Sequence, residues 1–224
     1  MTRNQQIRWF VKPAVFLLSV APSAWLVWAA LHGQLSVNPL ADLTNETGLW
    51  ALRFLSLTLC VRPLRRLSGW NDAIRFRRML GLFAFYYGSL HLLTYVVADR
   101  LAGLDFQGGV LAWTTARDLA ITVGSDVLKR PFITVGFTAW LCMLPLAITS
   151  TAGMIRRLGG RRWQALHRLT YVAAIVGVLH YWWLVKADVR RPEMYAVIVA
   201  GLLAFRVWRW ARPASAPTMR RVAA

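Results

Sequence analysis

The chain has 224 residues, of which 57% are hydrophobic and twelve are tryptophan. Soluble domains contain about 45–50% apolar residues, so the composition favours an integral membrane protein. The net charge of +18 would suit a nucleic-acid-binding protein. However, the arginines cluster between apolar segments, which argues for membrane topology and against nucleic acid as a partner.

Six segments are apolar enough to cross a bilayer, which takes about 20 residues of helix. The first follows a basic N-terminus and is too long for the apolar part of a signal peptide. The connection 98–130 is the longest and is predicted to hold a short interfacial helix. The sequence therefore predicts an all-α polytopic membrane protein, a six-transmembrane-helix bundle forming one domain over residues 1–224. Its spans are about 13–31, 45–61, 79–97, 131–151, 164–185 and 193–210.

Basic residues are distributed unevenly between the two sides of this predicted bundle. The N-terminus, the second and fourth connections and the C-terminal end carry 18 Lys and Arg residues, whereas the opposite loops carry 7. Of the nine acidic residues, only Asp72 belongs to the more basic side. Loops rich in Lys and Arg stay in the cytoplasm, so both termini are predicted to be cytoplasmic.

Three of the four histidines lie inside predicted spans, namely His91 in the third and His167 and His180 in the fifth. A polar ring in a span is costly and indicates a functional site. No Asp or Glu lies in the middle of a span, which disfavours a proton or cation relay. A zinc site would need a tighter set of ligands. Imidazoles on two facing helices suit haem iron.

Two of these histidines are predicted to lie at a similar depth in the membrane. His91 lies eight residues before Asp99 and His180 six residues before Lys186, which places them about 12 Å and about 9 Å from the external boundary at 1.5 Å per residue. We therefore predict that His91 and His180 are the two axial ligands of one haem in the outer half of the membrane.

His167 lies about 28 Å from the same boundary, near the cytoplasmic face. On a regular helix its ring would point about 140° away from that of His180, so both would face one partner only if the helix were irregular, for example near Gly177. Arg77 lies fourteen residues before His91, close to the depth of His167. This inner position fits a second haem whose propionates contact Arg77. It fits equally a histidine that supports another ligand or binds a quinone.

Arg53 is a charged residue within the second span. One interpretation is an arginine that faces the bundle or extends toward the membrane surface. The other is a ligand for a haem propionate, because a guanidinium matches the two oxygens of a carboxylate.

Three stretches together resemble one family: "RRMLGLFAFYYGSLHLLTY", "KRPFITVGFTAWLCMLPLAITS" and "RRLGGRRWQALHRLTYVAAIVGVLHYWW". They are similar to the MsrQ family, also called YedZ, within the ferric-reductase-like transmembrane group. In that group, paired histidines on the third and fifth helices hold b-type haems, and the matching positions here are His91, His167 and His180. Where the related oxidases have a second histidine on the third helix, this chain has Arg77.

This resemblance implies a haem b subunit in the bacterial inner membrane, with one haem or two. It would pass electrons from membrane quinol to the periplasmic molybdenum-containing reductase subunit MsrP, which repairs oxidised methionine in periplasmic proteins. FMN is implied by the resemblance alone, since the sequence has no flavin-binding motif. Two alternatives stay open: a stand-alone membrane ferric or quinone reductase, and a non-redox membrane transporter or scaffold whose histidines are structural.

Overall fold

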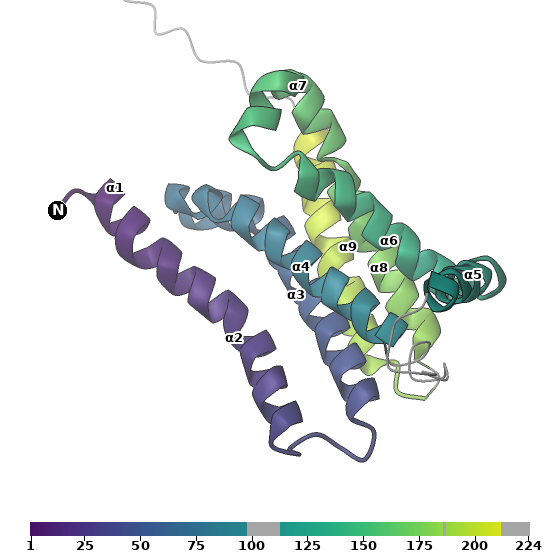
Figure 1. Cartoon of the computed structure of the whole chain (residues 1–224). Helices are drawn as coiled ribbons and strands as arrows, with labels where there is room; N and C mark the ends of the chain where they lie inside the picture. Colours follow the sequence, from purple (N-terminus) through teal and green to yellow (C-terminus); the bar gives the residue numbers. More distant parts are fainter. Residues whose placement is uncertain (98–112, 186, 212–224) are drawn as a thin grey trace, which may run out of the picture.

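The computed structural model describes residues 1–97, 113–185 and 187–211, and all regular elements in this part of the chain are helices, as predicted. Figure 1 shows most of them running side by side along one direction. The α-helices are α1 (Arg3–Gln6), α2 (Lys12–Leu31), α3 (Pro39–Ser68), α4 (Arg77–Tyr95), α5 (Trp113–Lys129), α6 (Pro131–Ile148), α7 (Ala152–Leu166), α8 (Leu169–Leu184) and α9 (Arg190–Ala211), with a π-turn η1 (Ile7–Val11) and a 3₁₀ turn η2 (Asn71–Arg75).

Two helix pairs form the centre of the molecule. Helix α3 packs along α4, and α6 packs along α8, while α9 contacts both α3 and α8 (Figure 1). Apolar side chains from these helices meet in one buried cluster, which joins the two pairs. Its members are Leu49, Leu52, Phe54, Leu55, Leu59, Phe83, Ala84, Tyr87, Met143, Ala173, Ala174, Val178, Tyr195 and Val199.

Helix α2 stands at the edge of this bundle and is joined to α4 through Tyr87. The backbone N–H of Ser23 donates to the Tyr87 hydroxyl at 3.1 Å, and that hydroxyl donates to the Ser19 carbonyl at 2.8 Å. These two backbone groups would be direct partners in a regular helix, but Pro22 interrupts the hydrogen-bond pattern beside them. The fully buried Tyr87 therefore provides hydrogen-bond partners for the two backbone groups of α2 near Pro22, and it fixes α2 against α4.

The predicted fifth span is shorter in the structure than the sequence suggests. Helix α7 ends at Leu166, His167 and Arg168 form a turn, and α8 begins only at Leu169. The helix continues through Gly177, so the irregularity lies at His167 and not near the glycine. Helix α7 is itself kinked at Gly159, where φ is 72°, a conformation that glycine adopts without the cost of a Cβ.

The longest connection contains a helix, as the sequence indicates. Helix α5 occupies residues 113–129 and is seen end-on in Figure 1, across the end of the bundle next to α6. The rest of that predicted connection, residues 98–112, lies outside the described residues. At the opposite end of α8, α7 forms the other boundary of the bundle (Figure 1).

Three helical stretches of the described chain are long and apolar enough to cross a membrane: Arg3–Leu31, Pro131–Ile148 and Arg190–Ala211. Helix α8 is apolar but shorter, with 16 residues. Large apolar side chains cover the outside of these helices, as expected where lipid replaces water. Examples that are at least half exposed are Leu17, Leu18, Val27, Trp183 and Val197. The fold is thus that of a helical protein with several candidate membrane spans.

Candidate functional site

A cavity of about 1270 Å³ lies between the α3–α4 pair and the α6–α8 pair. Its walls are mostly apolar, with side chains such as Leu52, Ala139, Trp140 and Met143. Polar groups gather at the end formed by the start of α3 and by the segment before α6. A large apolar cavity with a few polar groups is typical of a cofactor or ligand site.

His91 enters this cavity from α4, and α3 holds its ring in place. Its Nδ1 lies 2.8 Å from the carbonyl oxygen of Thr44. A carbonyl only accepts hydrogen bonds, so Nδ1 carries the proton and donates it. The lone pair of the neutral ring is therefore on Nε2, which is free to bind a metal ion.

His180 enters the cavity from α8, and α6 holds its ring in the same manner. Its Nδ1 lies 2.8 Å from the carbonyl oxygen of Phe132. Here too the proton is on Nδ1 and the lone pair on Nε2. Histidines that bind metals almost always donate their other N–H to such a partner, which fixes the tautomer and the ring orientation.

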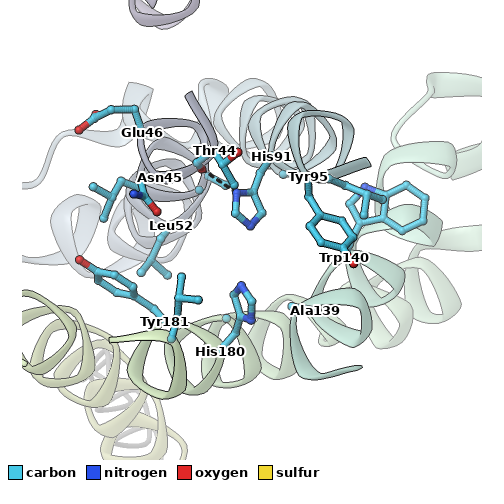
Figure 2. Close-up of a pocket in the computed structure, with 18 of the residues that line it drawn as sticks. Thr44, Asn45, Glu46, Leu52, His91, Tyr95, Ala139, Trp140, His180 and Tyr181 are labelled. Carbon is cyan, nitrogen blue, oxygen red and sulfur yellow. Dashed lines mark hydrogen bonds between the residues drawn. The ribbon is translucent and has the colours of Figure 1, made fainter. Parts of the chain in front are cut away.

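The two rings face one another across the cavity (Figure 2). Their centroids are 5.9 Å apart and their planes cross at 72°. Because an imidazole–metal bond is about 2 Å long, two imidazoles on opposite sides of one ion have centroids roughly 6 Å apart. The separation, the tautomers and the apolar walls all fit the axial ligation of one haem iron.

Two glycines lie directly against these rings, and the sequence analysis did not identify them. A Cβ on Gly48 of α3 would lie 2.9 Å from Nδ1 of His91, and one on Gly136 of α6 would lie 2.7 Å from Cε1 of His180. Only the placement of glycines within apolar spans could have drawn attention to them, because small residues there mark a close approach between helices.

His167 lies at the other end of α8, in the turn that separates it from α7. Its Nε2 is 3.3 Å from the hydroxyl of Thr149, and its ring stacks on Trp163 with centroids 3.9 Å apart. The indole N–H of Trp163 in turn donates to the Thr149 carbonyl at 3.0 Å. The structure thus separates His167 from the facing pair and places it in a polar cluster of its own.

Arg77 begins α4 and lies within electrostatic range of His167, as the sequence analysis predicted from its depth. It also lies within range of Arg62 and Arg206. Arg206 donates to the hydroxyl of Tyr171 at 2.7 Å and to the carbonyl of Leu59 at 2.8 Å. This end of the bundle therefore concentrates positive charge next to His167.

The structure gives Arg53 partners on α3 and α9. Its Nε donates to the Tyr195 hydroxyl at 3.3 Å, its guanidinium lies 4.4 Å from the ring of Trp50, and Glu46 is 3.8 Å away. Arg53 is not among the residues that line the cavity, whereas Arg130 and Arg191 are.

Arg130 is held at the polar end of the cavity by a short network. Its Nε is 3.3 Å from a carboxylate oxygen of Asp126, and the other oxygen of that carboxylate accepts from the Tyr95 hydroxyl at 2.8 Å. From the sequence, Arg130 was counted only as one of the basic residues in the loops. Its position over the cavity depends on the packing of α5 against α6.

No three His, Cys, Asp or Glu side chains come together as a multidentate metal site within the part of the chain that the structure describes. The facing histidines are therefore a two-ligand arrangement. Such a pair suits a metal whose other positions are filled by a planar macrocycle.

Comparison with known proteins gives the family. Residues 47–178 match the family model described as "Ferric reductase like transmembrane component". The heme-binding subunit MsrQ of the protein-methionine-sulfoxide reductase from Xanthomonas euvesicatoria pv. vesicatoria (strain 85-10) is 48% identical over 204 residues, which cover 88% of this chain and 86% of that protein. Subunits of the same name from Herminiimonas arsenicoxydans and Ralstonia nicotianae are 47% and 48% identical, with 89% and 88% of this chain and 86% and 85% of those proteins covered. The chain belongs to the MsrQ family and has the ferric-reductase-like transmembrane fold of a polytopic membrane protein.

Proposed function

We propose that this chain is the haem b electron-transfer subunit of a methionine-sulfoxide reductase system, with His91 and His180 as the axial ligands. The observation that carries the proposal is the pair of facing imidazoles, each with its Nδ1–H donated to a backbone carbonyl. Structural histidines would be expected to direct both nitrogens to protein partners. The haem-binding subunits that the chain resembles support the same cofactor by name, whereas their names give no support to FMN.

The chain's own residues bind the cofactor and exclude water from it. When bound, haem b supplies a one-electron carrier that is reduced and reoxidised in place. The apolar walls formed by Leu52, Ala139 and Met143 keep the site dry. Arg130 and Arg191 provide positive charge at the polar end, where haem propionates would be matched by guanidinium groups. We assign this role to them and not to Arg53, because Arg53 does not line the cavity.

The electrons come from membrane quinol and leave to a periplasmic molybdenum-containing catalytic subunit, MsrP. A quinol releases two electrons and two protons, and one sulfoxide consumes the same number to give methionine and water. The relatives are named as subunits, which supports a separate catalytic partner. A stand-alone ferric or quinone reductase would need no such partner. A transporter or scaffold would have no use for two free Nε2 atoms that face one another.

We call His167, Thr149 and Arg77 the inner cluster and propose that it forms a second site in the electron-transfer path. His167, Thr149 and the nearby Arg77 lie at the opposite end of α8 from His180. About thirteen helical residues span roughly 20 Å, so two sites at these positions would carry an electron across much of the bilayer. This cluster either holds a second haem through one imidazole or binds the quinol.

For topology we propose six spans in the bacterial inner membrane, within one domain over residues 1–224 and with both termini in the cytoplasm. The basis is the excess of Lys and Arg on one side, 18 against 7. A reporter enzyme that is active only in the periplasm is expected to be inactive when fused after Ala224. The same reporter fused within the 98–130 connection is expected to be active. The reverse pattern would contradict this orientation.

The function is tested with purified chain in proteoliposomes that contain quinol. We expect quinol to reduce the haem, and methionine sulfoxide to be reduced only when the catalytic subunit is added. In this proposal the catalytic subunit carries the molybdenum centre, so the chain alone is expected to give no methionine. Production of methionine without the partner, or a haem that quinol does not reduce although dithionite does, would refute the proposal.

A further inference from the structure

The two histidine positions are built on the same local plan. Thr44 precedes Gly48 by four residues on α3, and Phe132 precedes Gly136 by four residues on α6. In each case the carbonyl of the first residue accepts the imidazole Nδ1–H, and the glycine lies beneath the ring. One helical turn separates the two contacts, so each ring rests along a single turn of the neighbouring helix.

A side chain at either glycine would occupy the space of the imidazole. A Cβ on Gly48 would lie 2.9 Å from Nδ1 and 3.1 Å from Cε1 of His91. A Cβ on Gly136 would lie 2.7 Å, 2.8 Å and 3.1 Å from Cε1, Nδ1 and Nε2 of His180. Carbon atoms do not normally approach this closely. The ring could move away only by losing the hydrogen bond that fixes its tautomer.

We propose that Gly48 and Gly136 are positioning residues for the axial imidazoles. Each glycine forms a half-site with the carbonyl that lies one helical turn earlier, and the two half-sites have the same arrangement. The inference rests on the proposed haem ligation by His91 and His180. The two half-sites hold the ring planes at 72° to one another. Crossed axial imidazoles leave the two π-type d orbitals of low-spin iron nearly equal in energy, which gives a strongly anisotropic EPR signal.

Two helix glycines away from the cavity offer controls. A Cβ on Gly81 of α4, the helix that carries His91, would lie 3.7 Å from a methyl carbon of Thr58, and one on Gly201 of α9 would meet nothing within 4 Å. Neither contact is close, and neither glycine lines the cavity. Alanine is also the better helix former, so these substitutions are expected to leave the helices intact.

The test compares Gly48→Ala and Gly136→Ala with Gly81→Ala and Gly201→Ala in full-length chain. Spectra are recorded in membranes and normalised to a C-terminal fluorescent fusion, so that losses during purification do not affect the result. Groups that orient a metal ligand typically change affinity by about 10–100-fold when altered, and we expect haem affinity to fall by this factor in the first two variants. Their remaining reduced haem should bind carbon monoxide, and in the oxidised form a high-spin EPR signal should replace the low-spin one.

The two controls are expected to keep the haem content, the EPR signal and the resistance to carbon monoxide of the unmodified chain. The inference is overturned if Gly48→Ala and Gly136→Ala also keep all three, or if the controls lose haem to the same extent. The histidine variants separate this failure from failure of the proposed function. If His91→Ala and His180→Ala lose the low-spin signal while the glycine variants do not, only the glycine inference is wrong. If the histidine variants keep the signal, the proposed ligation is wrong and the inference falls with it.

Discussion

Replacing His180 by alanine is expected to abolish the low-spin haem spectrum of the purified chain, and replacing His91 is expected to do the same. In the proposed ligation each imidazole would supply one of the two bonds from the protein to the iron, so the loss of either would weaken or abolish haem binding. The loss should exceed the about 10–100-fold change that is typical when only an orienting group is removed. Absorption spectra of the oxidised and reduced forms, with haem quantified per chain, measure the effect.

His32 provides the control for this experiment. It is an exposed histidine after α2, and its Nδ1 lies 2.8 Å from the carbonyl of Trp28. It therefore makes the same kind of hydrogen bond as the proposed ligands, but away from the helix pairs that face the cavity. His32→Ala should leave the spectrum unchanged. A low-spin spectrum that survives in both His91→Ala and His180→Ala would disprove the assignment of the ligands.

Replacing His167 by alanine should separate the inner cluster from the outer site. We expect the spectrum of the outer haem to be retained, because His167 does not contact His91 or His180 and lies in a turn near the other end of α8. The rate at which quinol reduces the haem should fall by at least about tenfold, the lower bound for loss of a group that orients or binds a redox ligand. Stopped-flow absorbance after mixing with a soluble quinol measures this rate.

Haem quantitation on the same variant decides what the inner cluster binds. If it holds a second haem, His167→Ala should retain half the haem of the unmodified chain. If it binds quinol, the haem content should stay constant while the rate falls. Thr149→Val, which removes the hydroxyl next to Nε2 of His167, should have a smaller effect in the same direction. Unchanged haem content together with an unchanged rate in His167→Ala would exclude both roles.

Depth counting predicted which histidines would meet. His91 and His180 are far apart in the sequence, yet each lies at a similar number of residues from the outer boundary, and membrane helices have a fixed rise per residue. The position of a residue in a span therefore determines its depth in the bilayer. In the structure the centroids of these two rings are 5.9 Å apart. The same reasoning placed His167 apart from them.

The surroundings of these histidines could not be predicted from the sequence. The groups that orient the rings are backbone carbonyls of Thr44 and Phe132, and every residue has a carbonyl, so no residue type identifies them. Gly48 and Gly136 acquire their role only when α3 lies against α4 and α6 lies against α8. Such contacts depend on the rotation of each helix about its axis, which packing decides.

Charged residues were harder to assign than the histidines. Arg53 was a candidate for a haem propionate because it lies within an apolar segment. In the structure it contacts Trp50, Tyr195 and Glu46 and does not line the cavity. Arg130 was counted only as one of the basic residues in the loops. In the structure, the packing of α5 against α6 brings it to the polar end of the cavity. A long flexible cation reaches several partners, so its sequence position alone does not determine its role.

The most direct test of the account is the EPR spectrum of the purified, oxidised chain, recorded with iron and haem quantified per polypeptide. We predict at least one low-spin haem b per chain, with the strongly anisotropic signal that imidazole planes crossed at 72° should produce. A chain that purifies folded without haem, or whose haem is entirely high-spin, would contradict the central claim that His91 and His180 bind one iron between them.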